Sequence, residues 1–417
     1  MPAKKKQLKK GLSFIDRVIR ISVLLIAVTV NHLCYSQSSA EQPLTSDPVA
    51  DYMDAIEDVE AQFSAYSTEL ADLYLGLGKS LYSKKEYQNA RKAFQQGMQI
   101  ERVNYGLNSL TQAPYLVSIA DTESDLGNWK ESQKALENLY TINAKTYGAK
   151  DLRMLPVLDQ LLDWYMDSYK EREPKGGYSN LVISERIAAS IYDIINTDMP
   201  MDDPEAPDRY RRLGYLQFFI ANHIKQHGEP TDSGISVSMG GSSGRSSNAS
   251  TSHLHFQRGK LALEKVVESL LEQPGSTEID QALAIAELGD WHLIFGQKLS
   301  ASETYQLASD VLETVDNPEQ VRAELFSAPK MIIFSMDKQS LHSSETTEPQ
   351  LELSMIISSY GVPLKIDVAN APQSLTDQML RDVRKTIRTK RFRPKLVDGL
   401  AAESPYSMLY DQPTPKG

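Results

Sequence analysis

A spacing of 42 residues recurs in the first half of the chain, and it constrains the fold more than any other feature. Between Gly78 and Gly97, small residues that let two helix backbones approach alternate with large residues that fill the space between them. The same order returns in these corresponding pairs: Gly78 and Ala120, Tyr87 and Trp129, Ala90 and Ser132, Phe94 and Leu136, Gly97 and Leu139, Tyr105-Gly106 and Tyr147-Gly148, and Pro114 and Pro156. A fixed period of this length is typical of a helical solenoid.

This pattern resembles the tetratricopeptide repeat (TPR) in both its small and its large positions. The usual unit of that family has about 34 residues, so the resemblance implies a variety with longer helices. A later unit keeps one spacing, because Gly289 precedes Ala301 by the same 12 residues that separate Gly78 from Ala90. An irregular helical bundle is the alternative for the part between these units. Helices are expected there at about 153–171, 181–196, 207–227 and 254–272.

Residues 228–252 are rich in Gly and Ser and contain few apolar side chains. Such a segment cannot bury enough surface to offset the entropy lost on ordering. We therefore predict a disordered loop inserted in a solenoid that spans 41–325. A linker at 326–344 and a second domain at 345–417 are expected to follow.

After about residue 345 the pattern changes to strand, turn, strand, helix and strand. Residues 351–358 and 363–368 alternate between apolar and polar side chains, and Tyr360-Gly361 is a turn signal between them. The alternation predicts that the side chains of Leu364, Ile366 and Val368 share one face of the second strand.

An amphipathic helix with one apolar stripe is predicted next, and its end carries a run of basic residues. Ser374 or Thr376 is expected to cap its start, and Phe392 to pack beneath it. A site for a polyanion, such as a glycan strand or an anionic lipid headgroup, is the alternative for the basic run. The main expectation is that the cations at the C-terminal end of the helix form a solvated face, where their charge interacts favourably with the helix dipole. These cations are Arg384, Lys385, Arg388 and Lys390.

This order of elements resembles the C-terminal domain of the TonB family. The resemblance covers roughly 350–410, and its most specific part is Arg391-Phe392-x-Pro394 followed by Asp398-Gly399. Domains of that family bind a short extended peptide of an outer-membrane transporter by adding it to a sheet edge. The resemblance therefore implies a binding edge at the last strand and its surroundings, with the candidate residues Ser404, Tyr406, Met408, Leu409, Arg388 and Arg391.

The N-terminus has the pattern of an export signal. A basic stretch at 1–20 precedes an apolar run at 21–30, and small residues follow at Ser36 and Ala40. The apolar run is half the length of a spanning helix, which needs about 20 residues. We predict a cleaved signal peptide within 1–40 and an exported, periplasmic protein. An uncleaved anchor in the inner membrane is the alternative, and membrane association is expected only through this segment.

Catalytic motifs are missing from the sequence: it has neither a phosphate-binding glycine loop nor a Gly-x-Ser-x-Gly elbow. Four histidines could form a metal site, but no carboxylate or cysteine is spaced to complete it. They are expected to lie on the surface: His223, His227, His253 and His255. We therefore predict a chain that is not an enzyme and has no metal or cofactor. The net charge of −11 argues against nucleic acid as a partner.

Together these patterns predict a mainly α protein, in which a TPR-like solenoid precedes a small α+β domain resembling the TonB C-terminal domain. The expected function is a scaffold of the periplasm or cell envelope that binds proteins of the periplasm or outer membrane through the groove and the second domain. A TonB-like energy transducer is one alternative, although the chain lacks a Pro-rich spacer. A structural protein in contact with peptidoglycan is the other.

Overall fold

The computed structural model describes residues 47–172, 177–228, 248–336, 350–369, 375–397 and 399–411. The predicted signal peptide lies outside these residues. Residues 229–247 of the predicted loop at 228–252 lie outside them as well. Within the described ranges, no helix is both long enough and apolar enough to cross a membrane.

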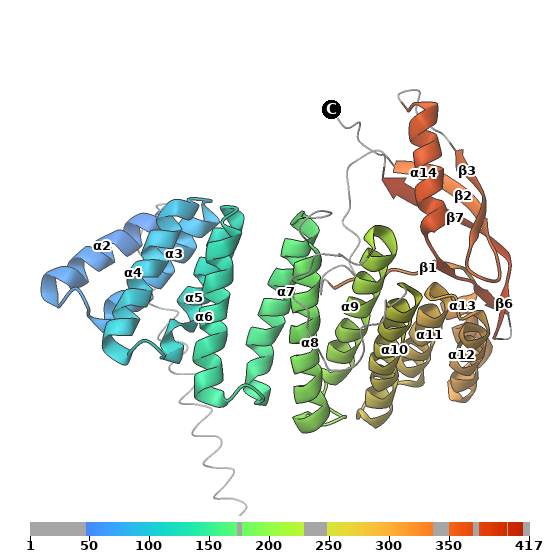
Figure 1. Ribbon diagram of the computed structural model, residues 1–417, viewed down its shortest axis with the longest axis horizontal. Coiled ribbons are helices and arrows are strands. Elements are labelled where there is room, and N and C mark those ends of the chain that lie inside the picture. The colour runs from blue at the N-terminus through green and yellow to red at the C-terminus, as the bar shows by residue number, and fades with distance from the viewer. Residues whose placement is uncertain are drawn as a thin grey trace, which may run out of the picture.

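The helices stand side by side in a row of successive pairs, and a small sheet lies at the C-terminal end of the row (Figure 1). All four helices expected between the repeat units are present. One expectation is wrong: residues 248–252 begin α10, because extending an existing helix closes a hydrogen bond per residue without a new nucleation cost. The helices are α2 (Pro48–Gln62), α3 (Thr68–Ser83), α4 (Tyr87–Tyr105), α5 (Ala113–Asp125), α6 (Trp129–Tyr147), α7 (Leu155–Arg172), α8 (Tyr178–Asp198), α9 (Ala206–His227), α10 (Asn248–Glu272), α11 (Glu278–Ile294), α12 (Lys298–Val311) and α13 (Pro318–Phe326).

The repeat of 42 residues corresponds to two successive helical pairs, α3–α4 and α5–α6. Both pairs end at a glycine with positive φ, +88° at Gly106 and +92° at Gly148. A short 3-10 turn then leads into the next pair, at Leu110–Gln112 and again at Leu152–Met154. The repeated sequence therefore produces a repeated turn as well as repeated helices.

Small residues bring the two helices of a pair together, as the sequence predicts. A Cβ atom on Gly78 would lie 2.3 Å from the Phe94 ring, so the ring rests on the bare backbone of α3. Gly289 and Tyr305 repeat this relation in α11 and α12, where the distance would be 2.5 Å. The first and the late unit therefore share one packing device.

The C-terminal region contains a small antiparallel sheet and one helix, which confirms the predicted order of elements. Strands β2 (Gln350–Ile357), β3 (Pro363–Ala369) and β7 (Ser404–Asp411) lie in the order β3-β2-β7. Helix α14 (Asp377–Thr389) buries Val383 and Ile387 in a cluster with the sheet. Two short pairs complete the region: β1 (Lys330–Met331) with β4 (Phe392–Arg393), and β5 (Lys395–Val397) with β6 (Leu400–Ala402).

The predicted face of β3 is wrong at one residue. Ile366 and Val368 turn toward the core, but the side chain of Leu364 is 41% exposed. The pairing register with β2 shifts between Ser354 and Ile356, and Lys365 there has a φ of +49°. This β-bulge inserts one residue and reverses the alternation beyond it.

Both ends of α14 follow the sequence prediction closely. The Thr376 hydroxyl accepts a hydrogen bond from the Met379 amide (3.3 Å) and caps the helix, whereas Ser374 lies outside the described residues. Phe392 is fully buried beneath the helix. The cations Lys385, Arg388 and Lys390 are exposed and Arg384 is half-buried, as expected of a solvated face.

The predicted linker at 326–344 is described as far as Met336, and this part is packed against its surroundings. Strand β1 pairs with β4, and the Ile332 amide donates a hydrogen bond to the Arg391 carbonyl (2.9 Å). Phe334 and Met336 are buried in the solenoid core. Residues 330–336 therefore touch both the repeats and the C-terminal sheet. The division into two domains at this point stays a prediction.

Candidate functional site

Helices α3, α5, α6 and α7, which belong to three successive pairs, surround a hollow of about 740 Å³. This volume is within the range of about 300–1,000 Å³ that ligand sites usually have. Five of the lining residues are acidic and one is basic. We call this hollow the acidic pocket, and its lining is Tyr82, Asp121, Ser124, Asp125, Gly127, Trp129, Leu136, Gln160, Asp163, Trp164, Asp167, Lys170 and Glu171.

Two tryptophans form the aromatic wall of the acidic pocket. The rings of Trp129 and Trp164 lie 5.9 Å apart, centroid to centroid, and both side chains are half-buried. The indole of Trp164 donates a hydrogen bond to the Ser124 hydroxyl (3.0 Å), which orients the ring. Trp129 begins α6 at the repeat position of Tyr87. The repeat therefore accounts for Trp129, whereas Trp164 has a threonine, Thr122, at the corresponding position 42 residues earlier.

The carboxylates on α5 leave negative charge at one side of the pocket. The Tyr82 hydroxyl donates a hydrogen bond to Asp125 (2.5 Å), and this bond, with burial, raises the pKa of Tyr82. Desolvation beside the pocket walls raises the pKa of the Asp121 carboxyl, and the charge of Asp125 adds to the effect, although the residue as a whole is exposed. Opposite them, Asp163 pairs with Arg212 and Asp167 with Lys170. A cation entering from solvent would therefore be attracted most strongly to the α5 side.

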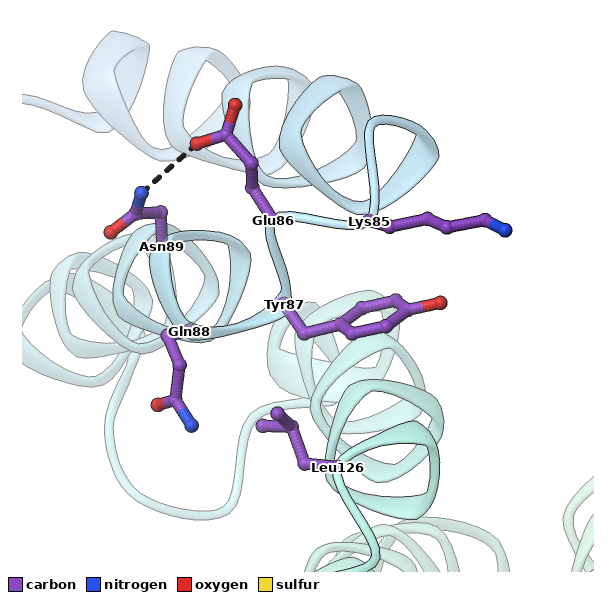
Figure 2. Close-up of a pocket in the computed structure, with 6 residues that line it drawn as sticks. All are labelled: Lys85, Glu86, Tyr87, Gln88, Asn89 and Leu126. Atoms are coloured by element: carbon purple, nitrogen blue, oxygen red, sulfur yellow. Dashed lines mark hydrogen bonds between the residues drawn. The ribbon is translucent and has the colours of Figure 1, made fainter.

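A second hollow of about 220 Å³ lies at the turn between α3 and α4 (Figure 2). Asn89 donates a hydrogen bond to Glu86 there (3.0 Å), while the Tyr87 ring projects beside Leu126. Tyr87 also packs edge-on against Tyr82 of the acidic pocket, with ring centroids 5.4 Å apart. Because the hollow is smaller than most ligand sites, it is better explained as the outer border of the acidic pocket.

The candidate residues of the last strand lie on an edge of the sheet, since β7 pairs with β2 alone in the described sheet. Tyr406 and Met408 turn toward the core beneath α14, whereas Leu409 points to the other face and is 63% exposed. Ser404, opposite Ile357 of β2, is buried.

The two candidate arginines lie together at the end of α14. Arg388 is exposed, and the half-buried Arg391 donates a hydrogen bond to the carbonyl of Lys390 (2.9 Å). The structure thus brings the strand residues together on β7 and the arginines together beside the helix. Their role in binding stays a prediction.

Two of the four histidines are not surface residues, which corrects the expectation from the sequence. His223 of α9 is buried against Tyr169 of α7 and Tyr178 of α8. His255 of α10 is instead buried against α9. His223 shares a hydrogen bond with the Tyr169 hydroxyl (3.1 Å), and His255 shares one with Gln217 (2.7 Å). Over the described ranges, no group of three or more His, Cys, Asp and Glu side chains is arranged to hold a metal ion.

One functional element was missed by the sequence analysis: a buried ion pair joins the last repeat to the C-terminal region. Arg393 of β4 donates two hydrogen bonds to Asp290 of α11, at 2.9 and 2.6 Å, and Tyr305 of α12 donates a third (2.8 Å). Burial lowers the pKa of the Arg393 guanidinium, but Asp290 beside it outweighs this, so the pKa is raised overall. The only sequence signal was a lone Asp290 among apolar residues.

A histidine beside this junction gives the stability a dependence on pH. His292 is buried, and burial lowers its pKa, as does the charge of Lys260. The folded protein therefore holds the ring neutral, whereas the unfolded chain takes up a proton below its ordinary pKa of 6.5. The unfolded state then binds more protons, so stability should fall as the pH drops below about 6.5.

When the pH is lowered from 7.5 to 5, we expect the free energy of unfolding to fall less in His292→Gln than in the original chain. This pH interval spans the ordinary pKa of the ring. Urea unfolding of both chains at the two pH values measures this difference. Replacement of the half-buried Gln306, which has no ionisable group, by Ala is the control and should leave the loss unchanged. Equal losses for the original chain and His292→Gln would show that another group sets the pH dependence.

Comparison with known proteins finds no matching family model and no matching curated protein. Among solved structures, BtubC (BKLC) from P. vanneervenii is similar at 12% identity over 68% of this chain and 93% of that one, with a TM-score of 0.38. A Podosopora anserina protein described as a putative kinesin light chain with nearly identical TPR-like repeats is similar at 14% identity. The match covers 61% of this chain and 97% of that one, with a TM-score of 0.36, and a substituted variant of the same protein gives the same values.

Proposed function

We propose that this protein is a non-catalytic interaction scaffold whose acidic pocket binds an extended, basic segment of a partner protein. The observation that carries the proposal is the joint presence of five carboxylates and two tryptophans in one open hollow. Carboxylates attract Lys and Arg side chains, and indole faces favour the same cations. A flexible segment can follow the row of helices and place several cations along it.

The proposed setting is the periplasm or cell envelope. This rests on the export pattern at 1–40, which makes partners in the periplasm or the outer membrane the ones to seek. In that setting the scaffold would be exported and non-catalytic, with one partner on the repeats and a second contact at the C-terminal region.

A second candidate function is that of a TonB-like protein that adds a transporter peptide to β7. The specific observation in its favour is the edge position of this strand. Pro405 lies within β7 and lacks a backbone donor, which limits how far a new strand can pair along it. We therefore rank this function below binding at the acidic pocket.

The acidic pocket is tested with a fluorescent octapeptide of alternating Lys and Ala and a matched Glu-Ala peptide. We expect the Lys peptide to bind the full chain and the Glu peptide not to bind. Asp121→Asn with Asp125→Asn should weaken binding about tenfold, because two ion pairs of about 0.7 kcal/mol each are lost. Added salt should weaken binding further.

The matched control is Glu131→Gln with Glu137→Gln on α6, which removes the same charge outside the pocket lining. These substitutions should leave the affinity within about twofold of the original, as expected for charges beyond close range. If both double variants weaken binding equally, the peptide responds to overall charge, and the acidic pocket is not its site.

A further inference from the structure

The chain fills a second aromatic pocket with one of its own side chains. After β1 it continues over the repeats, and the ring of Phe334 lies 4.8 Å from Tyr215, 5.1 Å from Phe218 and 5.5 Å from Trp291, measured between centroids. Tyr215 and Phe218 belong to α9, and Trp291 belongs to α11. We call these three residues the Phe334 pocket.

The Phe334 pocket continues the series of helices that forms the acidic pocket. Helices α9 and α11 are the first helices of the two pairs after α7, as α3, α5 and α7 are of theirs. Asp163 of the acidic pocket pairs with Arg212, which lies one turn before Tyr215 on α9. The two pockets are thus neighbours along one row of helices.

The segment that enters the pocket has the form of a bound peptide. Residues 332–336 are in neither a helix nor a strand. Their side chains alternate. Phe334 and Met336 are buried against the repeats, whereas Ile333, which directly precedes Phe334, is 65% exposed. An extended peptide in a protein groove inserts alternate side chains in this way.

The walls of the Phe334 pocket are held by bonds that do not involve Phe334. The Tyr215 hydroxyl donates a hydrogen bond to Glu287 of α11 (2.5 Å), and Arg211 pairs with the same carboxylate (2.9 Å). The Trp291 indole donates to the carbonyl of Phe256 (3.0 Å). Tyr215 and Trp291, two of the three walls, are therefore anchored to neighbouring helices, and the pocket should keep its shape when the phenylalanine leaves.

From this geometry we infer that the Phe334 pocket is a peptide-binding site separate from the acidic pocket. Its ligand class is an extended apolar segment with a phenylalanine anchor. In this structure the chain's own residues 332–336 are that ligand, and a second segment of the same chemistry can replace them. The tether gives the internal segment an effective concentration of the order of millimolar, so it competes strongly with free peptides.

The test uses the full chain and a fluorescent peptide with the sequence KMIIFSM of residues 330–336. Phe334→Ala empties the pocket, so we expect this variant to bind the peptide at least about tenfold more tightly than the original chain, because the tethered competitor is gone. A peptide with Ala in place of its Phe should bind neither chain. Adding Phe218→Ala to the Phe334→Ala chain should abolish the gain.

Ile333→Ala is the matched control, because it shortens an exposed side chain of the same segment. It should bind the peptide no better than the original chain. Equal affinity for the original and Phe334→Ala chains would overturn the inference, as would the same gain in Ile333→Ala. Loss of folding in Phe334→Ala, seen by circular dichroism, would also overturn it, since the segment would then be required core.

Discussion

Replacing Asp290 with alanine is expected to lower the free energy of unfolding by about 3–5 kcal/mol. The side chains of Arg393 and Asp290 are only 6% and 10% exposed, so the substitution leaves a buried guanidinium without its carboxylate. It also removes the acceptor of the Tyr305 hydroxyl. Urea unfolding followed by tryptophan fluorescence, to which the buried Trp291 beside the ion pair contributes, measures the loss.

Asp208→Ala is the matched control, because it removes an ion pair with Arg211 in which the carboxylate is 86% exposed. Its expected cost is about 0–1 kcal/mol. Replacing both partners, with Asp290→Leu and Arg393→Met, should restore most of the stability, since no buried charge remains. If Asp290→Ala costs no more than Asp208→Ala, the junction is open to water and does not join the two regions.

The second large effect is expected at Gly361, where alanine should lower the free energy of unfolding by about 2–6 kcal/mol. Its φ is +67°, a conformation whose strain costs a residue with a side chain about 1–3 kcal/mol. The added Cβ would also lie 2.0 Å from the Phe392 carbonyl oxygen, and crowding of this kind costs about 1–3 kcal/mol more. The oxygen is backbone and cannot rotate away. Thermal and urea unfolding of Gly361→Ala measure the sum.

Gly106→Ala separates the two causes, because Gly106 also has a positive φ but its Cβ would meet no described atom within 4 Å. Its expected cost is about 1–3 kcal/mol, from backbone strain alone. A cost at Gly361 equal to that at Gly106 would mean that the turn moves away from Phe392 freely. The contact between this turn and β4 would then contribute little.

The substitutions at Asp290 and Gly361 both act where the last repeat meets the C-terminal region. Leu396 of β5 packs in the same cluster as Ala301 and Tyr305 of α12, and the Gly361 turn touches Leu293 of α11. A partner bound on the repeats and a second partner at β7 would therefore be held on one continuous body.

The sequence by itself determined the local structure of this protein. The spacing of 42 residues predicted the helical pairs, and Gly78 and Gly289 marked where an aromatic ring rests on a bare backbone. Tyr360-Gly361 predicted the turn between β2 and β3, and the stripe that includes Val383 predicted α14. These features depend on neighbours within one helical pair or one hairpin, so their residue pattern contains the necessary information.

The binding surfaces were decided by the tertiary structure alone. Arg393 follows the basic run at the end of α14, and the partner that buries it, Asp290, lies 103 residues earlier in the chain. His223 and Phe334 are buried by helices distant in sequence, and the acidic pocket gathers side chains from three repeats. Residue patterns record the period of a helix or a strand, whereas the neighbour that covers a charge or a ring depends on how whole elements pack.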